Sequence, residues 1–226
     1  MRVAFIGPVG SGKSTQAQRL SWTMPFYNRV PRLSTGDLVR AQIEARTPLG
    51  DEMRAYHDAG DPVPDGVILG LLLPHVRTAG GFVLDDLPAN VAQAEALDAE
   101  LEERSAGPLH RVISLEGPTE DELVERVLGG RVHSRTTDVP YHLKHDPPPE
   151  PGERLDPGPF VRRGDDTEEA LRRRLGAYRQ EHELLKERYE ERGVLTVVDA
   201  RRSLNEVAED ILEALGHPEG QRYYVS

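Results

Sequence analysis

The chain has 226 residues, a formal net charge of −11 and no cysteine. This length suits one domain, and the missing cysteines exclude a disulfide framework and a cysteine-ligated zinc site. The acidic balance argues against a protein that coats nucleic acid, and no apolar run is long enough to cross a bilayer. We expect a cytoplasmic protein, because the first apolar run ends in glycines before it reaches the length of a signal peptide.

Residues 7–15 read GPVGSGKST and match the phosphate-binding pattern G-x-x-x-x-G-K-[ST], with Lys13 and Ser14 in register. The apolar run within 1–6 predicts a buried strand before the loop, and 13–24 predicts a helix after it. In this setting glycine N–H groups and the helix N-terminus bind phosphate, the lysine reaches the outer phosphates, and the serine hydroxyl binds Mg²⁺. A glycine-rich turn without a ligand is the alternative interpretation.

Short apolar periodicities after this helix predict a subdomain of small helices beside the phosphate loop. Serine, threonine and aspartate favour helix starts because their side-chain oxygens accept backbone N–H bonds. In chain order we expect a loose segment at 25–31, a helix capped by Ser34 or Thr35 and ending near 45, a break at 47–50, a helix over 51–59 ended by Gly60, a turn at 61–64 and a helix capped by Asp65.

The rest of the chain alternates between buried apolar runs and helical periodicity. This alternation predicts an α/β fold with a P-loop NTPase-type parallel sheet flanked by helices, an inserted helical subdomain and a lid. In chain order we expect a strand over 81–86, a helix over 90–103, a strand over 111–115, a helix over 120–128 with a capping box at Thr119 and Glu122, an irregular segment at 129–160, a helix from 166 or 167 to 192, a strand over 194–199, a helix over 204–215 and a mobile tail at 216–226.

Ligands in such folds bind at the carboxyl ends of the strands, where Asp85 and the phosphate loop meet. Asp85 either holds Mg²⁺, directly or through water, or caps the following turn. The Pro-, Gly-, His- and Asp-rich segment 129–160 is typical of a functional lid or of disorder. Its three histidines form either a metal site or hydrogen bonds within the lid; they are His133, His142 and His145.

Arginine and aspartate side chains follow this segment. Arg162 and Arg163 precede Asp165 and Asp166, and Arg174 follows within the next helix. Such pairs beside a nucleotide lid stabilise the charge of a transferring phosphoryl group. On composition alone, the arginines at 172–174 instead form a solvated helix face.

Together these motifs resemble the adenylate kinase family in its bacterial long-lid form, from residue 1 to about 215. The run STGDLVR at 34–40 is similar to the family's monophosphate-site signature. GFVLD at 81–85 is similar to the strand before the family's Asp-Gly-Phe-Pro-Arg motif. Gln93 lies where the family places the glutamine that reads adenine, and the residues from Arg163 to Arg174 match its Arg-x-Asp-Asp pair and following arginine.

The resemblance implies transfer of the terminal phosphoryl of Mg·ATP to AMP, giving two ADP. Positioning and charge stabilisation carry such a reaction, and a closed lid excludes water. The implied ATP contacts are Gly10, Ser11, Gly12, Lys13, Ser14, Thr15 and Arg126. The implied AMP contacts are Thr35, Arg40, Val63, Gln93, Arg163 and Arg174. The implied catalytic residues are Lys13, Asp85, Arg126, Arg163 and Arg174, with Mg²⁺ on Ser14 and Asp85.

The resemblance also implies a single nucleoside monophosphate kinase domain and a monomer. The core would comprise 1–33, 62–128 and 165–215, the NMP-binding subdomain 34–61 and the lid 129–164. ATP and AMP are the expected partners and Mg²⁺ is the expected cofactor. Structural zinc, a nucleic acid polymer and a membrane are not expected.

Two arginines of the family pattern are missing from this chain. The family's Asp-Gly-Phe-Pro-Arg becomes DDLPA at 85–89, which places Asp86 at the glycine and Ala89 at the arginine. The family's Gly-Arg-Arg before the lid becomes Gly-Gly-Arg, with Gly130 at the first arginine. Each lost charge-assisted contact in a dry site costs about 2–4 kcal/mol, or roughly 10²- to 10³-fold in rate. The candidate replacements are Arg131, Arg135 and Arg162.

These departures leave two alternatives beside a kinase for AMP. One is a degenerate family member that binds ATP or another nucleotide with little turnover and serves as a binding or regulatory protein. The other is a kinase for a different small acceptor, because the altered residues lie on the acceptor side.

Overall fold

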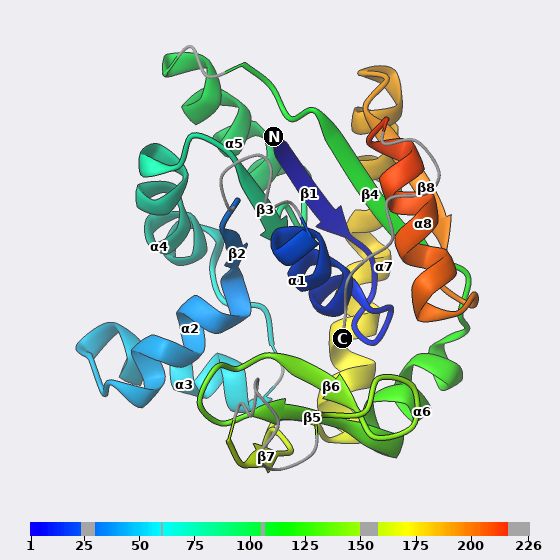
Figure 1. Ribbon diagram of the computed structural model, residues 1–226. Helices are drawn as coiled ribbons and strands as arrows, with labels where there is room; N and C mark the ends of the chain where they lie inside the picture. Colours follow the sequence, from blue (N-terminus) through cyan, green and yellow to red (C-terminus); the bar gives the residue numbers. More distant parts are fainter. Residues whose placement is uncertain (24–29, 60, 105–106, 150–157, 217–226) are drawn as a thin grey trace.

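The computed structural model describes residues 1–23, 30–59, 61–104, 107–149 and 158–216. Its centre is a sheet of five parallel strands in the order β2-β3-β1-β4-β8 (Figure 1). The strands are β1 Arg2–Ile6, β2 Arg32–Ser34, β3 Phe82–Asp85, β4 Arg111–Glu116 and β8 Leu195–Asp199. The predicted parallel α/β fold is confirmed, and the short edge strand β2 is an element that the sequence analysis missed.

Alternate side chains of β1 point to opposite faces of the sheet and pack against different helices. Ala4 and Ile6 belong to the core under α4, α5 and α7, whereas Val3 and Phe5 belong to the core under α1 and α8 (Figure 1). Helices therefore cover both faces, as a parallel sheet requires. The covering helices are α1 Lys13–Thr23, α4 Asp65–Thr78, α5 Val91–Glu103, α7 Glu168–Glu191 and α8 Leu204–Ala214.

Helices α2 Thr35–Glu44 and α3 Pro48–Ala59 follow β2 and share a small core around Met53. The predicted break between these helices is present but lies at 45–47 and not at 47–50, because Pro48 is already the first residue of α3. A proline is tolerated at this position, where the missing N–H would have no partner within the helix. The hydroxyl of Thr47 instead accepts a hydrogen bond from the Gly50 N–H at 2.9 Å.

The segment predicted to be irregular, 129–160, contains ordered strands, so that expectation is wrong in part. Helix α6 Glu120–Gly130 leads into β5 Arg131–Ser134, which pairs with β6 Pro140–His142 and with β7 Phe160–Val161. Tyr141 and Phe160 meet edge to face at 5.4 Å between ring centroids. This small antiparallel sheet lies beside α2 and α3, across from the carboxyl ends of the central strands (Figure 1).

The predicted cap at Asp65 is also wrong. Pro64 occupies the N-cap position of α4, and Asp65 is the first helical residue. Its carboxylate contacts Asn90 and Gln93 instead. A helix cap uses neighbouring backbone N–H groups. The Asp65 carboxylate instead binds Asn90 and Gln93, two side chains from a distant part of the chain.

Parts of several expectations lie outside the described residues. These are the last residue of the helix expected over 13–24, most of the loose segment at 25–31, the helix end at Gly60, residues 150–157 of the segment expected to be irregular, and all but the first residue of the tail at 216–226. Within the described residues, every helix is too short or too polar to cross a membrane.

Candidate active site

A cavity of about 830 Å³ lies at the carboxyl ends of the central strands, between the phosphate loop, α2 and the small sheet. All the residues to which the resemblance assigns ATP, AMP or metal contacts line it. They are Gly10, Ser11, Gly12, Lys13, Ser14, Thr15, Thr35, Arg40, Val63, Asp85, Gln93, Arg126, Arg163 and Arg174. The fold thus brings residues from most of the chain to the rim that the sequence analysis predicted.

The phosphate loop wraps the start of α1 with glycines in conformations that other residues rarely adopt. Gly10 and Gly12 have φ values of 85° and 97°. Lys13 is 7 % exposed, and its Nζ donates to the carbonyl oxygens of Gly7 at 2.6 Å and Pro8 at 2.8 Å. Its Nζ also lies 3.3 Å from a carboxylate oxygen of Asp86.

The carboxylate of Asp85 ends β3 and is held by Arg32 of β2. The guanidinium Nη2 of Arg32 lies 2.7 Å from Asp85 Oδ2, and its Nη1 lies 2.8 Å from Asp37 Oδ2. Burial alone would lower the pKa of Arg32, but the two carboxylates outweigh it and raise that pKa. The sequence analysis missed Arg32, and its only signal was a charged residue two positions before the buried Ser34.

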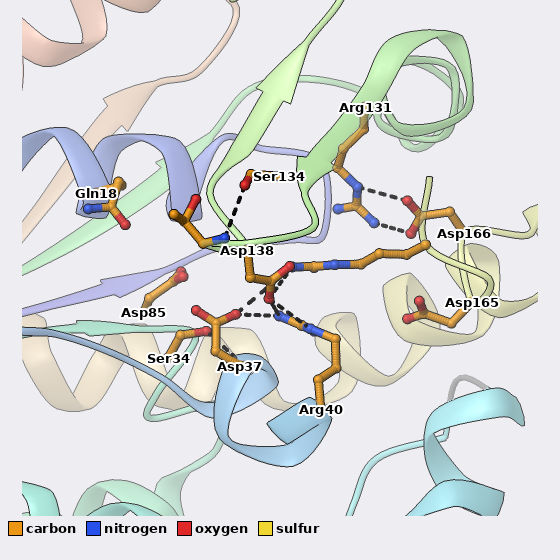
Figure 2. A network of polar contacts seen from close by, with 12 residues as sticks. Gln18, Ser34, Asp37, Arg40, Asp85, Arg131, Ser134, Asp138, Asp165 and Asp166 are labelled. Carbon is orange, nitrogen blue, oxygen red and sulfur yellow. Dashed lines mark hydrogen bonds and ion pairs between the residues drawn. The ribbon is translucent and has the colours of Figure 1, made fainter. Parts of the chain in front are cut away.

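The carboxylate of Asp138, from the turn between β5 and β6, lies between Arg40 of α2 and Arg163 (Figure 2). Arg40 Nε is 3.0 Å from Asp138 Oδ2, and Arg163 Nη2 is 2.9 Å from Oδ1. Burial alone would raise the pKa of Asp138, but the two guanidinium groups hold it well below its usual range. Two arginines that the resemblance assigns to AMP therefore already hold an anion of the protein itself.

Two further arginines beside this network pair with two carboxylates that directly precede α7. Arg174 Nη2 lies 2.6 Å from Asp165 Oδ2, and Arg131 makes a bidentate contact with Asp166 (Figure 2). Burial, with Arg163 and Arg131 nearby, lowers the pKa of His133 to about 2, so its imidazole is neutral at pH 7. His133 therefore adds hydrogen-bonding capacity without further charge.

The side-chain amide of Gln93, in the first turn of α5, lines the cavity. Its Oε1 accepts from the Ala89 N–H at 2.8 Å, and its Nε2 donates to Asp65 Oδ1 at 2.6 Å. Asn90 holds the same carboxylate, with its Nδ2 2.9 Å from Asp65 Oδ2. Gln93 is 5 % exposed, so these contacts are shielded from bulk water.

Several buried polar atoms around the cavity have no partner within the described protein. Native structures pair nearly all such atoms, so a cluster of them indicates a place where a ligand or water binds. They include Ser11 Oγ, Asp85 Oδ1, His133 Nδ1, Arg163 Nε and Asp165 Oδ1.

Comparisons with known proteins point to one family. The family model described as adenylate kinase matches residues 5–194. The chain belongs to the adenylate kinase family. It is 39 % identical over 219 residues to an adenylate kinase of Streptomyces coelicolor, covering 95 % of this chain and 98 % of that protein. It is 40 % identical over 220 residues to one of Thermodesulfovibrio yellowstonii, covering 95 % and 99 %. It is 37 % identical over 222 residues to one of Clostridium perfringens, covering 96 % and 99 %.

Within this adenylate kinase family member, Asp86 stands at the position of the pattern's glycine and keeps a glycine-like backbone. Its φ is 69°, in the left-handed region that aspartate tolerates better than most residues. The substitution therefore preserves the turn after β3 and adds a carboxylate beside Lys13. The side chain of Ala89, at the missing arginine, lines the cavity without charge.

The second missing arginine is explained in part by local packing. A Cβ atom at Gly130 would lie 2.7 Å from His142 Cε1, so the imidazole fills the space of a side chain at position 130. His142 Nδ1 accepts from the N–H groups of Lys144 and His145 at 3.2 Å, and its Nε2 lies 3.0 Å from the Arg126 carbonyl oxygen. These partners require the tautomer with hydrogen on Nε2.

Of the candidate replacements for the missing arginines, only Arg131 lines the cavity. Arg162 is exposed, and its Nη1 lies 3.2 Å from the Leu128 carbonyl oxygen. The position of Arg162 therefore does not support its proposed compensating role.

Proposed function

We propose that this chain transfers the terminal phosphoryl group of Mg·ATP to AMP and forms two ADP. The observation that carries the proposal is that the phosphate loop and the expected AMP residues line one cavity. Membership of the adenylate kinase family over almost the whole chain supports the same reaction. These two findings disfavour both alternatives, the degenerate binding protein and the kinase for another acceptor.

In the proposed reaction the ATP phosphates bind the backbone of the loop at 10–15 and the ammonium of Lys13. Arg126, whose Nη1 lies 2.9 Å from the Ala200 carbonyl oxygen, contributes to the ATP side. The AMP phosphate binds Arg40 and displaces Asp138 from it. An oxygen of that phosphate attacks the γ-phosphorus of ATP, and the bond from this phosphorus to the β–γ bridging oxygen breaks.

On the acceptor side, the proposal places AMP against Thr35, Val63 and Gln93, with Arg163 and Arg174 beside the transferring group. Thr35 is 8 % exposed at the first position of α2. Arg163 is largely buried, and burial with Arg40 nearby lowers its pKa to about 10, so it remains charged at pH 7. Fixed positive groups in a water-poor site stabilise the charge that spreads over the transferring phosphoryl oxygens.

Mg²⁺ with ATP is the cofactor that we propose, and the residues present fit it. Asp85 Oδ1 is buried without a partner, and Asp85 and Ser14 line the same cavity. A carboxylate, a hydroxyl and nucleotide phosphates are the oxygen ligands that Mg²⁺ prefers, and the bound ion would neutralise phosphate charge. The described residues hold no cluster of three His, Cys, Asp or Glu side chains arranged for a metal. Such a cluster is not needed where phosphates supply ligands.

We further propose that 34–61 forms the NMP-binding subdomain and 129–164 forms the lid of a single domain. The small core that α2 and α3 share, against which side chains of α4 also pack, and the separate small sheet support this division. Closure of both parts over the nucleotides would exclude water and so prevent hydrolysis of ATP. A monomeric state and a cytoplasmic location remain predictions.

The test is nucleoside diphosphate formation from Mg·ATP with AMP, CMP, GMP, UMP and dTMP as acceptors. We expect fast ADP formation with AMP. Lys13→Ala should lower kcat by about 10²- to 10³-fold, because it removes a charged donor to the transferring phosphates. The exposed Lys144→Ala is the matched control and should leave kcat unchanged. ATP binding without turnover of any acceptor would overturn the proposal.

A further inference from the structure

The amide of Gln93 is held at both ends by groups that cannot exchange roles. The Ala89 backbone N–H only donates, and it lies 2.8 Å from Gln93 Oε1. The Asp65 carboxylate accepts, and its Oδ1 lies 2.6 Å from Gln93 Nε2. A half-turn of the amide would place N–H against N–H and oxygen against carboxylate.

The carboxylate of Asp65 is itself fixed. Asn90 Nδ2 lies 3.1 Å from Asp65 Oδ1 and 2.9 Å from Oδ2, while Asn90 Oδ1 accepts from the Gln93 N–H at 2.8 Å. Asn90 is therefore tied to the helix that carries Gln93 and to the carboxylate that orients it. The order of oxygen and nitrogen on the Gln93 amide follows from these neighbours.

Each end of the Gln93 amide has one further hydrogen-bonding position. An amide oxygen has two acceptor sites and an amide nitrogen has two hydrogens, and the contacts described use one of each. Gln93, Asp65 and Ala89 all line the cavity. The remaining acceptor and donor form a pair whose order is set by the protein.

This pair matches one class of purine. The Watson–Crick edge of a 6-aminopurine offers a donating amine beside the accepting N1, which pairs with an amide oxygen beside an amide N–H. A 6-oxopurine offers the reverse, an accepting oxygen beside a donating N1–H. To bind it the same way, Gln93 would have to turn over and oppose both Ala89 and Asp65.

We infer that Asp65 is a positioning residue that fixes the orientation of the Gln93 amide and thereby selects 6-aminopurine over 6-oxopurine nucleoside monophosphates. This inference rests on the proposed function, in which the Gln93 side of the cavity receives the acceptor base. Sites with buried, oriented hydrogen-bonding groups reject the mismatched partner strongly, because the mismatch leaves those groups unpaired.

The test compares AMP with IMP, which has the reversed edge and lacks the 2-amino group of GMP. Asp65→Asn keeps the size of the side chain, but an asparagine amide can turn to meet either end of Gln93. We expect the AMP:IMP ratio of kcat/KM to fall at least tenfold, while KM for ATP and the unfolding temperature stay within error of the wild type. The ratio of the dissociation constants for AMP and IMP, measured by titration calorimetry, should fall in parallel.

The matched control is Asp61→Asn, which removes another cavity carboxylate that pairs with Arg173 and not with Gln93. It should keep the wild-type ratio. In a Gln93→Ala background, Asp65→Asn should have no further effect on the ratio, because Asp65 acts through Gln93.

An unchanged ratio in Asp65→Asn, or an equal fall in Asp61→Asn, would overturn the inference. Absence of ADP formation from AMP by the wild type would instead reject the proposed function. In that case the dissociation constants still decide the inference, since they need no turnover.

Discussion

The residue Ala89 shows how one position can serve the site through its backbone and weaken it through its side chain. Its N–H orients Gln93, while its methyl group stands where the family pattern has an arginine. The neighbouring Asp86 places a carboxylate 3.3 Å from Lys13 Nζ. Near the proposed acceptor phosphate, the chain has thus lost one positive charge and gained one negative charge relative to that pattern.

Ala89→Arg should therefore raise kcat/KM for AMP by about 10- to 100-fold, since a hydrogen bond to a charged group contributes about 1.5–3 kcal/mol. Steady-state kinetics at fixed saturating ATP measures the effect. Ala89→Gln, which adds length without charge, should not reproduce it. An unchanged kcat/KM in Ala89→Arg would mean that other arginines of the cavity, with Arg131 as the candidate named above, already supply this contact.

Helix caps are the elements for which local sequence was most informative. The capping box at Thr119 and Glu122 is confirmed, with Glu122 Oε2 2.7 Å from the Thr119 backbone nitrogen, and Ser34 caps α2 as one of the two expected residues. Such caps depend on residues within one turn of each other, which is why a sequence pattern detects them. The cap expected at Asp65 failed because its carboxylate has partners in another element.

Thr119→Ala should lower the free energy of unfolding by about 1 kcal/mol and the melting temperature by about 2–4 °C. The physical reason is that the hydroxyl satisfies an N–H at the start of α6 that has no partner within the helix. Thermal unfolding followed by circular dichroism measures the shift. Thr119→Ser keeps the hydroxyl and should stay close to the wild type, so an equal loss in both variants would contradict the capping explanation.

Glu116 joins the end of β4 to α7. Burial alone would raise its pKa, but hydrogen bonds with His182, Ser114 and Lys186 outweigh burial and lower the pKa to about 2, well below the usual range of a glutamate. A carboxyl whose pKa is depressed by folding stabilises the protein above its unfolded pKa and loses this contribution as the pH falls. The stability that Glu116 provides should therefore be complete at pH 7 and disappear between about pH 5 and pH 2.

Glu116→Gln should consequently be less stable than the wild type at pH 7, and the difference should shrink towards pH 2. Urea unfolding at a series of pH values measures it. The exposed Glu187→Gln serves as the control and should follow the wild-type pH profile. A constant difference at every pH would show that Glu116 acts through packing and not through its charge.

At the scale of the whole molecule, carboxylates of the proposed lid hold arginines of other parts. Asp138 contacts Arg40 of α2, and Asp146 lies 3.5 Å from Arg19 of α1. These ion pairs join the small sheet and its connecting turns to α2 and to α1. A phosphate that binds Arg40 must then replace an anion that is already present.

Asp138→Asn should lower KM for AMP by about two- to five-fold, because an ion pair of this exposure (Asp138 is 36 % exposed) contributes about 0.2–1 kcal/mol. KM for ATP should not change. Asp146→Asn, which weakens the ion pair with Arg19 instead of the one with Arg40, should leave KM for AMP unaltered. A higher KM for AMP in Asp138→Asn would show that Asp138 assists acceptor binding and does not compete with it.

The sequence by itself determined the central strands β1, β3, β4 and β8, the helices that cover them and the phosphate loop. These features depend on apolar periodicity and on motifs within about ten residues, so a short stretch of neighbouring residues is enough to detect them. It also predicted that the phosphate loop, Asp85 and the ends of the lid share one rim, because the carboxyl ends of parallel strands meet there. The other residues of the cavity were predicted from the family resemblance. The strand β2, the start of α3 and the strands β5, β6 and β7 were not predicted, since short strands leave too few residues to show a period.

Only the tertiary structure decided how the charged groups are paired. Arg32 with Asp85, Asp138 with Arg40 and Asp65 with Gln93 are separated by 53, 98 and 28 residues in the chain. No local pattern predicts such partners. Arginine and aspartate are most often exposed to solvent, so their presence in a sequence does not indicate a buried ion pair. Packing of distant elements removes water from these side chains, and each then has to take the partner that the fold places beside it.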